Sequence, residues 1–367
     1  MKKIFVLLLA LLSFTVLIGC KNNPFEGEKI VLITDKGDIT DKSFNQGAYE
    51  GVKAYAIENE IEYGYLKPEE ATDEQYIAAI EQAIADGATV IVTPGYLFEP
   101  AINEVQGDYP EVKFILLDGN PANATNGTLG SNVYSVFYAE EQAGFLAGYA
   151  AVMDGYRKLG FMGGLAVPAV QRFGHGYIQG IAKAAADLSL ADGAITVDYL
   201  YTGDFRATPE VQAAAATMYT NNVEVIFACG GAVGQSVMAA AETASAKVIG
   251  VDVDQSADSP TVITSAMKSL AVSVQQALAA IFEDGTWAAE FGGKSVVLGV
   301  EDDGVALPNN FTKFTDFDAT DYATVYGKLV AGTYTVSSTI GAFGDDGTAA
   351  LQFATAKVIV NKIAFEG

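Results

Sequence analysis

Histidine is almost absent from this chain, since His175 is the only one in 367 residues. A zinc site of the HExxH type needs two histidines, and a Ser-His-Asp triad needs one placed as a base. His175 instead lies between two glycines, and the sequence holds neither a G-x-S-x-G elbow nor a P-loop. These absences disfavour an enzyme, and we expect a protein that binds without catalysing.

Cysteine is nearly as scarce, with Cys20 and Cys229 as the only two. Cys229 ends the apolar run Val225-Ile226-Phe227-Ala228-Cys229, where a free cysteine is usually a small buried side chain. No disulfide framework is therefore expected, and stability must come from ordinary cores. A chain of 367 residues forms two domains more readily than one.

Basic residues are few, with 21 Lys and Arg against 45 Asp and Glu and a formal net charge of −24. A protein that binds a nucleic-acid polymer shows a basic patch, and no such cluster occurs here. The acidity is most simply explained by solubility. The loops considered below as ligand contacts are also poor in Lys and Arg, so a phosphorylated ligand is disfavoured.

Long apolar runs are missing except for residues 4–18, which carry no charge and follow Lys2 and Lys3. Fifteen residues are too few for a membrane-spanning helix, which needs about 20, but they suit a signal peptide. The run ends in Leu17-Ile18-Gly19-Cys20, which resembles a bacterial lipobox. We expect a lipoprotein signal peptide over 1–19, acylation of Cys20, and a lipid-anchored tether over 20–28 on the extracytoplasmic face of the cell membrane. The alternative is an ordinary secretory peptide with an incidental cysteine.

What the rest of the chain does contain is short apolar runs that alternate with Ala-rich amphipathic segments. This pattern predicts parallel βαβ units and hence an α/β protein with two doubly wound parallel-sheet lobes. We expect one lobe over 29–136 plus about 265–293 and the other over 137–264 plus about 294–367, joined by several strand crossings. Strands are predicted at 30–34, 89–93, 113–117, 159–162, 195–200, 223–228, 247–251 and 262–265, and helices at 42–59, 73–86, 140–153, 169–187, 209–220, 234–244 and 270–283.

The loops richest in functional groups follow the predicted strands. In open parallel sheets, ligands bind at the carboxyl ends of the strands, so two facing lobes would form a cleft lined by these loops. The loops are 35–45, 93–96, 117–120, 203–205, 229–231 and 251–254.

Residues 35–46, Asp-Lys-Gly-Asp-Ile-Thr-Asp-Lys-Ser-Phe-Asn-Gln, are the most distinctive of these loops. They resemble the Asp-x-Gly-Gly-x-x-Asp-Lys-Ser-Phe-Asn-Gln opening of the basic membrane protein family, the substrate-binding lipoproteins of ABC transporters. Asp38 stands where the family often has a second glycine, which could alter the local turn. Further matches occur in the family's order at 141–148, 176–180, 250–255 and 264–268. The resemblance implies a type I periplasmic binding protein fold with a hinge between the lobes.

The resemblance also implies a purine nucleoside ligand and suggests roles for individual residues. The base would lie between the rings of Phe44 and Phe205, and stacking of this kind is worth about 1–3 kcal/mol per base. Asn45 and Asp118 would hydrogen-bond to the edge of the base.

The sugar would meet a second group of residues. Asp252 or Asp35 would accept hydrogen bonds from the ribose diol, and Lys268 would donate to sugar oxygens. Gly231, with Gly230, would let the backbone approach the sugar closely.

Several of these residues have simpler explanations. Asp41 and Ser43 have the position and the side chains of helix caps, and we favour this role for Asp41. Phe44 could be a core residue of the same helix, and Asp254 could be a turn residue. Asp252-x-Asp254-x-Ser256 resembles the start of a calcium loop, but Ala257 replaces the required glycine, and we expect no metal and no cofactor.

The sequence therefore predicts capture of a nucleoside by closure of two lobes and its delivery to a membrane permease. A nucleoside-cleaving enzyme, a surface adhesin or antigen, and a sugar-binding protein of the same fold are the alternatives. Sugar sites between such lobes are often lined by tryptophan, and the single Trp287 lies in an acidic segment that we expect to be peripheral.

Overall fold

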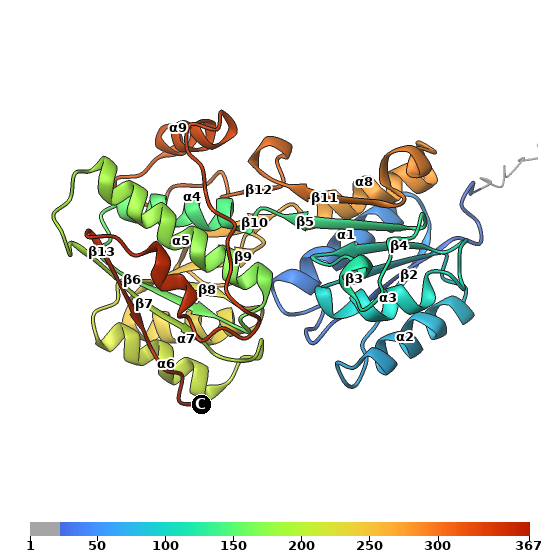
Figure 1. The fold of residues 1–367 in the computed structure, drawn as a ribbon, viewed down its shortest axis with the longest axis horizontal. Coiled ribbons are helices and arrows are strands. Elements are labelled where there is room, and N and C mark those ends of the chain that lie inside the picture. Colours follow the sequence, from blue (N-terminus) through green and yellow to red (C-terminus); the bar gives the residue numbers. More distant parts are fainter. Residues whose placement is uncertain (1–22) are drawn as a thin grey trace, which may run out of the picture.

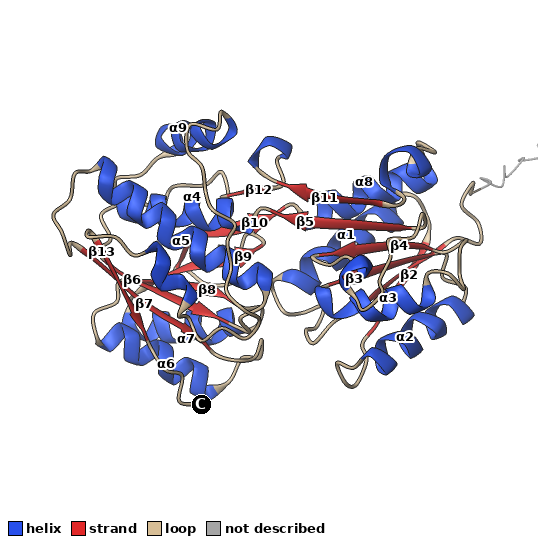
Figure 2. Ribbon diagram, viewed as in Figure 1, coloured by secondary structure: helices blue, strands red, loops and turns tan. Residues whose placement is uncertain are grey.

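The computed structural model describes residues 23–367, which form two α/β lobes placed side by side (Figure 1). Each lobe has a central, mostly parallel sheet with helices on both faces (Figure 2). The central strands are buried on both sides, and every residue of Val90–Pro94 and of Val225–Cys229 is buried. Continuous apolar strands are the expected consequence, because both faces of such a sheet are covered.

The first lobe contains a six-stranded sheet with the order β11-β5-β4-β3-β1-β2. Its strands are β1 (Lys29–Ile33), β2 (Glu62–Leu66), β3 (Val90–Pro94), β4 (Lys113–Leu117), β5 (Val133–Tyr138) and β11 (Lys294–Leu298). Its helices are α1 (Phe44–Glu58), α2 (Asp73–Ala85), α3 (Glu99–Val105) and α8 (Leu270–Phe282), with the short turns η1 (Tyr96–Phe98), η2 (Pro121–Asn123) and η3 (Trp287–Phe291).

The second lobe contains a seven-stranded sheet with the order β12-β10-β9-β8-β6-β7-β13. Its strands are β6 (Lys158–Gly163), β7 (Ile195–Tyr201), β8 (Val225–Cys229), β9 (Lys247–Asp252), β10 (Val262–Lys268), β12 (Val305–Ala306) and β13 (Val358–Lys362). Its helices are α4 (Glu140–Met153), α5 (Pro168–Asp187), α6 (Pro209–Thr220), α7 (Val233–Ala244) and α9 (Ala319–Val330), with the short turns η4 (Val300–Asp302) and η5 (Ala349–Phe353).

The predicted fold class of two parallel-sheet lobes is confirmed, and every predicted strand and helix is present. The prediction omitted β2, β5, α3 and α9, and it expected short strands after about residue 294 without giving their bounds. β2 is an edge strand that holds a glycine and has no fully buried residue, so it lacks the apolar run of the central strands. An exposed edge strand of this kind therefore has the weakest hydrophobic pattern in the sequence.

The chain crosses between the lobes after β5, after β10 and after β11, and the predicted boundaries need correction at the last two crossings. β10 pairs with β9 as far as Met267, so residues 265–268 belong to the second lobe, although they were expected in the first. β11 pairs in parallel with β5 along its whole length, so residues 294–298 belong to the first lobe, although they were expected in the second. Strand pairing decides membership, and no local property of these segments reveals their partners.

The expected signal peptide and the acylated Cys20 lie outside the described residues. The last part of the expected tether, from Asn23, is in contact with the first lobe. The ring of Phe25 meets that of Phe282 edge-on at 5.6 Å, and Asn23 Nδ2 donates to the carbonyl of Glu60. An aromatic side chain in this segment explains why it packs instead of remaining a free linker.

Candidate ligand-binding cleft

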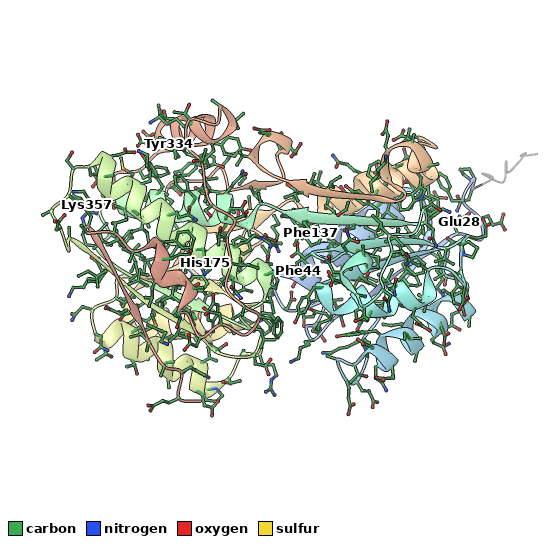
Figure 3. The ribbon with its side chains drawn as sticks, viewed as in Figure 1. Glu28, Phe44, Phe137, His175, Tyr334 and Lys357 are labelled. Carbon is green, nitrogen blue, oxygen red and sulfur yellow. The ribbon has the colours of Figure 1, made fainter. Side chains whose placement is uncertain are left out.

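A cleft of about 720 Å³ lies between the two lobes, at the carboxyl ends of β1, β3, β4, β8 and β9. This volume is within the range of small-molecule sites. All eight residues predicted as ligand contacts line this one cleft, although they come from segments far apart in the chain: Asp35, Phe44, Asn45, Asp118, Phe205, Gly231, Asp252 and Lys268. Figure 3 labels Phe44 and Phe137 at the junction of the lobes, and both line the cleft.

The loop between β1 and α1 is held by its own carboxylates. Asp41 accepts hydrogen bonds from the backbone N–H groups of Ser43, Asn45 and Gln46, so it caps the first turn of α1 as favoured above. Ser43 makes no cap and instead donates its hydroxyl to Asp252 of the second lobe.

Asn45 is buried, and its amide holds this loop together. Its Nδ2 donates to Asp35 at 2.9 Å and to Asp41 at 3.0 Å, and its Oδ1 accepts from the backbone N–H of Asp35 at 3.3 Å. Both amide hydrogens are therefore used within the loop, which leaves one lone pair of Oδ1 for a ligand.

Lys268 links the lobes through a buried ion-pair network. Its Nζ lies 2.7 Å from Asp118 of the first lobe, 3.4 Å from Asp252 and 3.5 Å from Glu140. Arg172 of α5 pairs with the other oxygen of Glu140 at 2.6 Å. Two cations thus face three carboxylates in a nearly dry site, which makes their protonation interdependent.

The carboxylates around Lys268 hold its pKa above the usual value, so the ammonium stays charged. Arg172 and Lys268 lower the pKa of Glu140 despite its complete burial. Burial raises the pKa of Asp118 to about 7. Lys268 opposes this rise only in part, because it also pairs with Glu140 and Asp252. Oδ1 of Asp118 is buried and has no hydrogen-bond partner among the described residues. A buried acceptor without a partner costs free energy until a donor reaches it.

Asp118 and Asp252 both adopt left-handed backbone conformations, with φ of 52° and 66°. Asp118 directly follows β4 and Asp252 ends β9, and both line the cleft. Such conformations cost energy for residues other than glycine, although aspartate tolerates them better than most, and they concentrate at functional sites.

The predicted aromatic pair comes from opposite lobes. Phe44 is half-buried at the start of α1, and Lys268 Nζ lies 4.5 Å from its ring centre. Phe205 is half-buried between β7 and α6, and its ring packs against Gly164. A methyl group at Gly164 would lie within 3.0 Å of the Phe205 ring, so the glycine after β6 makes room for it.

The sequence analysis missed several lining residues, and the expected shortage of cations in the cleft was wrong. Lys36 and Tyr96 lie within the predicted loops 35–45 and 93–96, whereas α5, the loop after β2 and the loop after Phe205 contribute side chains from outside the predicted loops. Apart from Lys268, the cations that line the cleft are Lys36, Lys67, Arg172 and Arg206, and Tyr96, Glu99 and Phe173 line it as well. Lys67 pairs with Asp38 at 2.7 Å and Arg206 with Asp204 at 2.8 Å.

Three further residues with expected roles, Trp287, Cys229 and Asp254, have clear positions in the structure. Trp287 is buried in the first lobe, not peripheral as expected, because it stacks on Phe291 and donates Nε1 to the carbonyl of Ser131. Cys229 is buried, as predicted, although its position at the end of β8 also places it on the cleft wall. Asp254 accepts from the backbone N–H of Ser256, which is the geometry of a turn residue.

Two features are absent from the part of the chain that the structure describes. Residues 23–367 contain no group of three or more His, Cys, Asp or Glu side chains that could hold a metal ion. Within the same range, every helix is too short or too polar to span a bilayer.

Known proteins resemble this chain in sequence and in fold. A family model described as ABC transporter substrate-binding protein PnrA-like matches residues 28–336. This chain belongs to the PnrA-like family. The resemblance carried by residues 35–46 is thereby confirmed, and membership makes the chain the substrate-binding component of an ABC transporter, which implies a ligand and a permease.

Individual relatives support the same assignment. The ABC transporter nucleoside-binding protein BmpA of Lactococcus lactis subsp. cremoris is 29% identical over 268 residues, 67% of this chain and 72% of that protein. Basic membrane protein A1 of Borrelia garinii subsp. bavariensis is 31% identical over 276 residues, 73% of this chain and 78% of that protein. A solved ABC transporter solute-binding protein of Aeropyrum pernix K1 aligns with a TM-score of 0.72 at 21% identity, covering 85% of this chain and 93% of that one, and so shares the fold.

Proposed function

We propose that this protein captures purine nucleosides in the cleft and delivers them to a membrane permease. The observation that carries the proposal is the pair of rings, Phe44 and Phe205, which line one cleft from opposite lobes. A flat base stacked between them would bind both lobes at once and favour their closure.

The edge of the base would meet Asp118. Its buried Oδ1 has no partner among the described residues, and an N–H group of a purine would supply one. Asn45 would contribute the remaining lone pair of its Oδ1, since its amide hydrogens are used by Asp35 and Asp41.

The ribose would lie toward the second lobe. Asp252 and Lys268 would bind its hydroxyl groups, with Asp35 as a further acceptor from the first lobe. Gly231 has φ of 56°, a conformation that favours glycine, and a Cβ built there would lie 3.6 Å from Phe205; without a side chain its backbone would approach the sugar closely.

A phosphate group fits this cleft poorly. Four of the five lining cations are already paired, Lys67 with Asp38, Arg172 with Glu140, Arg206 with Asp204 and Lys268 with Asp118. Lys36 alone stands outside these four pairs, so a phosphate of charge about −2 would have to break pairs or remain partly uncompensated. We therefore expect nucleosides to bind more tightly than their 5′-phosphates.

The name of the Lactococcus relative, an ABC transporter nucleoside-binding protein, supports this ligand class. In the same proposal, Cys20 carries the lipid that holds the protein on the extracytoplasmic face of the membrane. No cofactor takes part, and the permease distinguishes the closed from the open arrangement.

Mass spectrometry of small molecules released from the purified protein tests the proposal, followed by calorimetry with inosine, guanosine and GMP. We expect a purine nucleoside to be released, micromolar or tighter binding of nucleosides, and much weaker binding of GMP. Release of a free sugar would favour the sugar-binding alternative, and no binding of any nucleoside would leave the adhesin alternative. Conversion of inosine to base and ribose would show an enzyme.

A further inference from the structure

The C-terminal segment 337–367 follows the last residue that the family model matches, Val336. In Figure 1 it descends from α9 along the side of the second lobe that faces the first. It then forms η5 and ends as β13, which adds a parallel strand to the edge of the sheet beside β7. The segment is thus an ordered part of the second lobe.

Gln171 of α5 fastens the early part of this segment. Its side chain is fully buried, and its Nε2 donates to the carbonyls of Ala166 and Ala342, both at 2.8 Å. Its Oε1 accepts from the backbone N–H of Gly341 at 2.7 Å, and the N–H of Gly344 donates to Ala166 at 3.0 Å. Every hydrogen-bonding atom of a buried amide is therefore used to hold residues 341–344.

These residues are held beside the wall of the cleft. Ala166 directly precedes Val167 and Pro168, which line the cleft where α5 begins. The C-terminal segment is thus hydrogen-bonded to the residue that immediately precedes this wall.

The side chain of Phe343, within the fastened stretch, reaches the other lobe. Its ring centre lies 5.8 Å from that of Tyr96, at an interplanar angle of 58°. Tyr96 belongs to η1 of the first lobe and lines the cleft. Phe343 nevertheless remains 64% exposed, so its ring contributes little to the core of its own lobe.

We propose that residues 337–348 form a C-terminal strap and that Phe343 is a positioning residue, which acts through Tyr96 to favour the closed lobes and slow ligand release. A contact shifts an open–closed equilibrium only if it differs between the two states. The contact between Phe343 and Tyr96 joins separate lobes, so opening breaks it, while the Gln171 hydrogen bonds lie within one lobe and persist. The identity of the ligand in this inference rests on the proposed function.

The test is Phe343→Ala, with Ile359→Ala as the matched control. Ile359 lies in β13 of the same segment and is 47% exposed, so neither change should lower the melting temperature much. An aromatic pair corresponds to about a two- to tenfold change in an equilibrium or rate. We expect guanosine to dissociate faster by this factor from the Phe343→Ala protein in stopped-flow measurements, and at the wild-type rate from the control. Equal dissociation rates in all three proteins would overturn the strap.

A double-mutant cycle with Tyr96→Ala separates positioning from a general structural effect. If Phe343 acts through Tyr96, its removal should no longer change the dissociation rate once Tyr96 is already alanine. Phe343→Tyr should keep the wild-type rate, because it preserves the ring. Fully additive effects of the two alanine substitutions would contradict the inference.

The two proposals fail in different ways. If the wild-type protein binds no nucleoside, the proposed function is wrong, and the strap is judged on the ligand-free protein by small-angle X-ray scattering. We then expect a larger radius of gyration for Phe343→Ala than for Ile359→Ala. Equal radii would overturn the strap whatever the ligand.

Discussion

Phe44 has two possible roles, and its surroundings allow them to be separated. It begins α1, is half-buried, and touches both the cleft and the core of the first lobe. Phe114 in β4 is a useful comparison in the same lobe, because it is fully buried and does not line the cleft.

Replacing Phe44 by alanine should weaken guanosine or inosine binding by about 1–3 kcal/mol, the usual value of one stacked base. The melting temperature of the ligand-free protein should change little. Phe114→Ala should instead cost about 3–5 kcal/mol of unfolding free energy, as truncation of a core ring does. Thermal melts with and without ligand distinguish the two, since ligand stabilisation follows the dissociation constant. A Phe44→Ala protein that melts much earlier but keeps its ligand-induced shift would show a structural role.

Asp118 predicts a pH dependence of binding. Burial raises its pKa to about 7 in the ligand-free protein, and the ionised carboxylate accepts a hydrogen bond from a base N–H group much more strongly than the neutral acid does. A raised pKa means that protons compete with the ligand as the pH falls through about 7. Nucleoside affinity should therefore be full near about pH 8 and about tenfold lower near about pH 6, since each unit below the pKa costs a factor of ten.

Calorimetry across this range measures the effect, and Asp118→Asn is the control. The substitution removes the titrating group, so its affinity should be lower and nearly constant with pH. A wild-type affinity that does not vary between these pH values would exclude Asp118 as the acceptor for the base.

At the scale of elements, α4 and α5 pack more closely than any pair of helices with larger side chains could. Gly144 and Gly148 of α4 face the carbonyls of Phe173 and Tyr177, while Gly176 and Gly180 of α5 face those of Glu141 and Phe145. A methyl group at any of these four glycines would lie within 3.0 Å of the carbonyl it faces. The pair carries Glu140 and Arg172 of the ion-pair network, so its spacing also sets the geometry of the cleft.

Gly176→Ala should accordingly lower stability by about 1–3 kcal/mol, because the helices must move apart. Gly327 of α9 provides the control, since nothing lies within 4 Å of its Cβ position. Gly327→Ala should stabilise the protein by about 0.4–1 kcal/mol, as alanine restricts the unfolded chain and favours the helix. Urea unfolding of both variants measures the difference, and equal stability would contradict close packing of α4 and α5.

At the scale of the whole molecule, the proposed lipid anchor determines where capture takes place. Cys20→Ser should release the protein into the medium or leave an uncleaved precursor, because serine cannot be acylated as the thiol is. Fractionation and mass spectrometry of the intact protein measure both outcomes. Cys229→Ala is the control, since Cys229 is buried in the second lobe and should not affect membrane attachment. Unchanged membrane association and mass in Cys20→Ser would contradict the anchor.

Much of the architecture was predictable because it has a local cause. Apolar strands such as Val90–Pro94 and Val225–Cys229 are buried on both faces, so their composition alone marks them as central strands of a parallel sheet. Many of the residues that line the cleft could also be predicted, because the carboxyl ends of parallel strands share one edge of a sheet. This rule predicted that Asp35, Asp118 and Asp252 share one cleft, and all three line it.

Other features were decided only by the tertiary structure. The sheets to which Val262–Lys268 and Lys294–Leu298 belong depend on strand pairing. The involvement of Arg172 depends on the packing of α5 against α4. The contact of Phe343 with Tyr96 joins positions that are far apart in the chain. Local periodicity reports which face of a segment is buried, whereas the partner across that face is chosen by the packing of the whole chain.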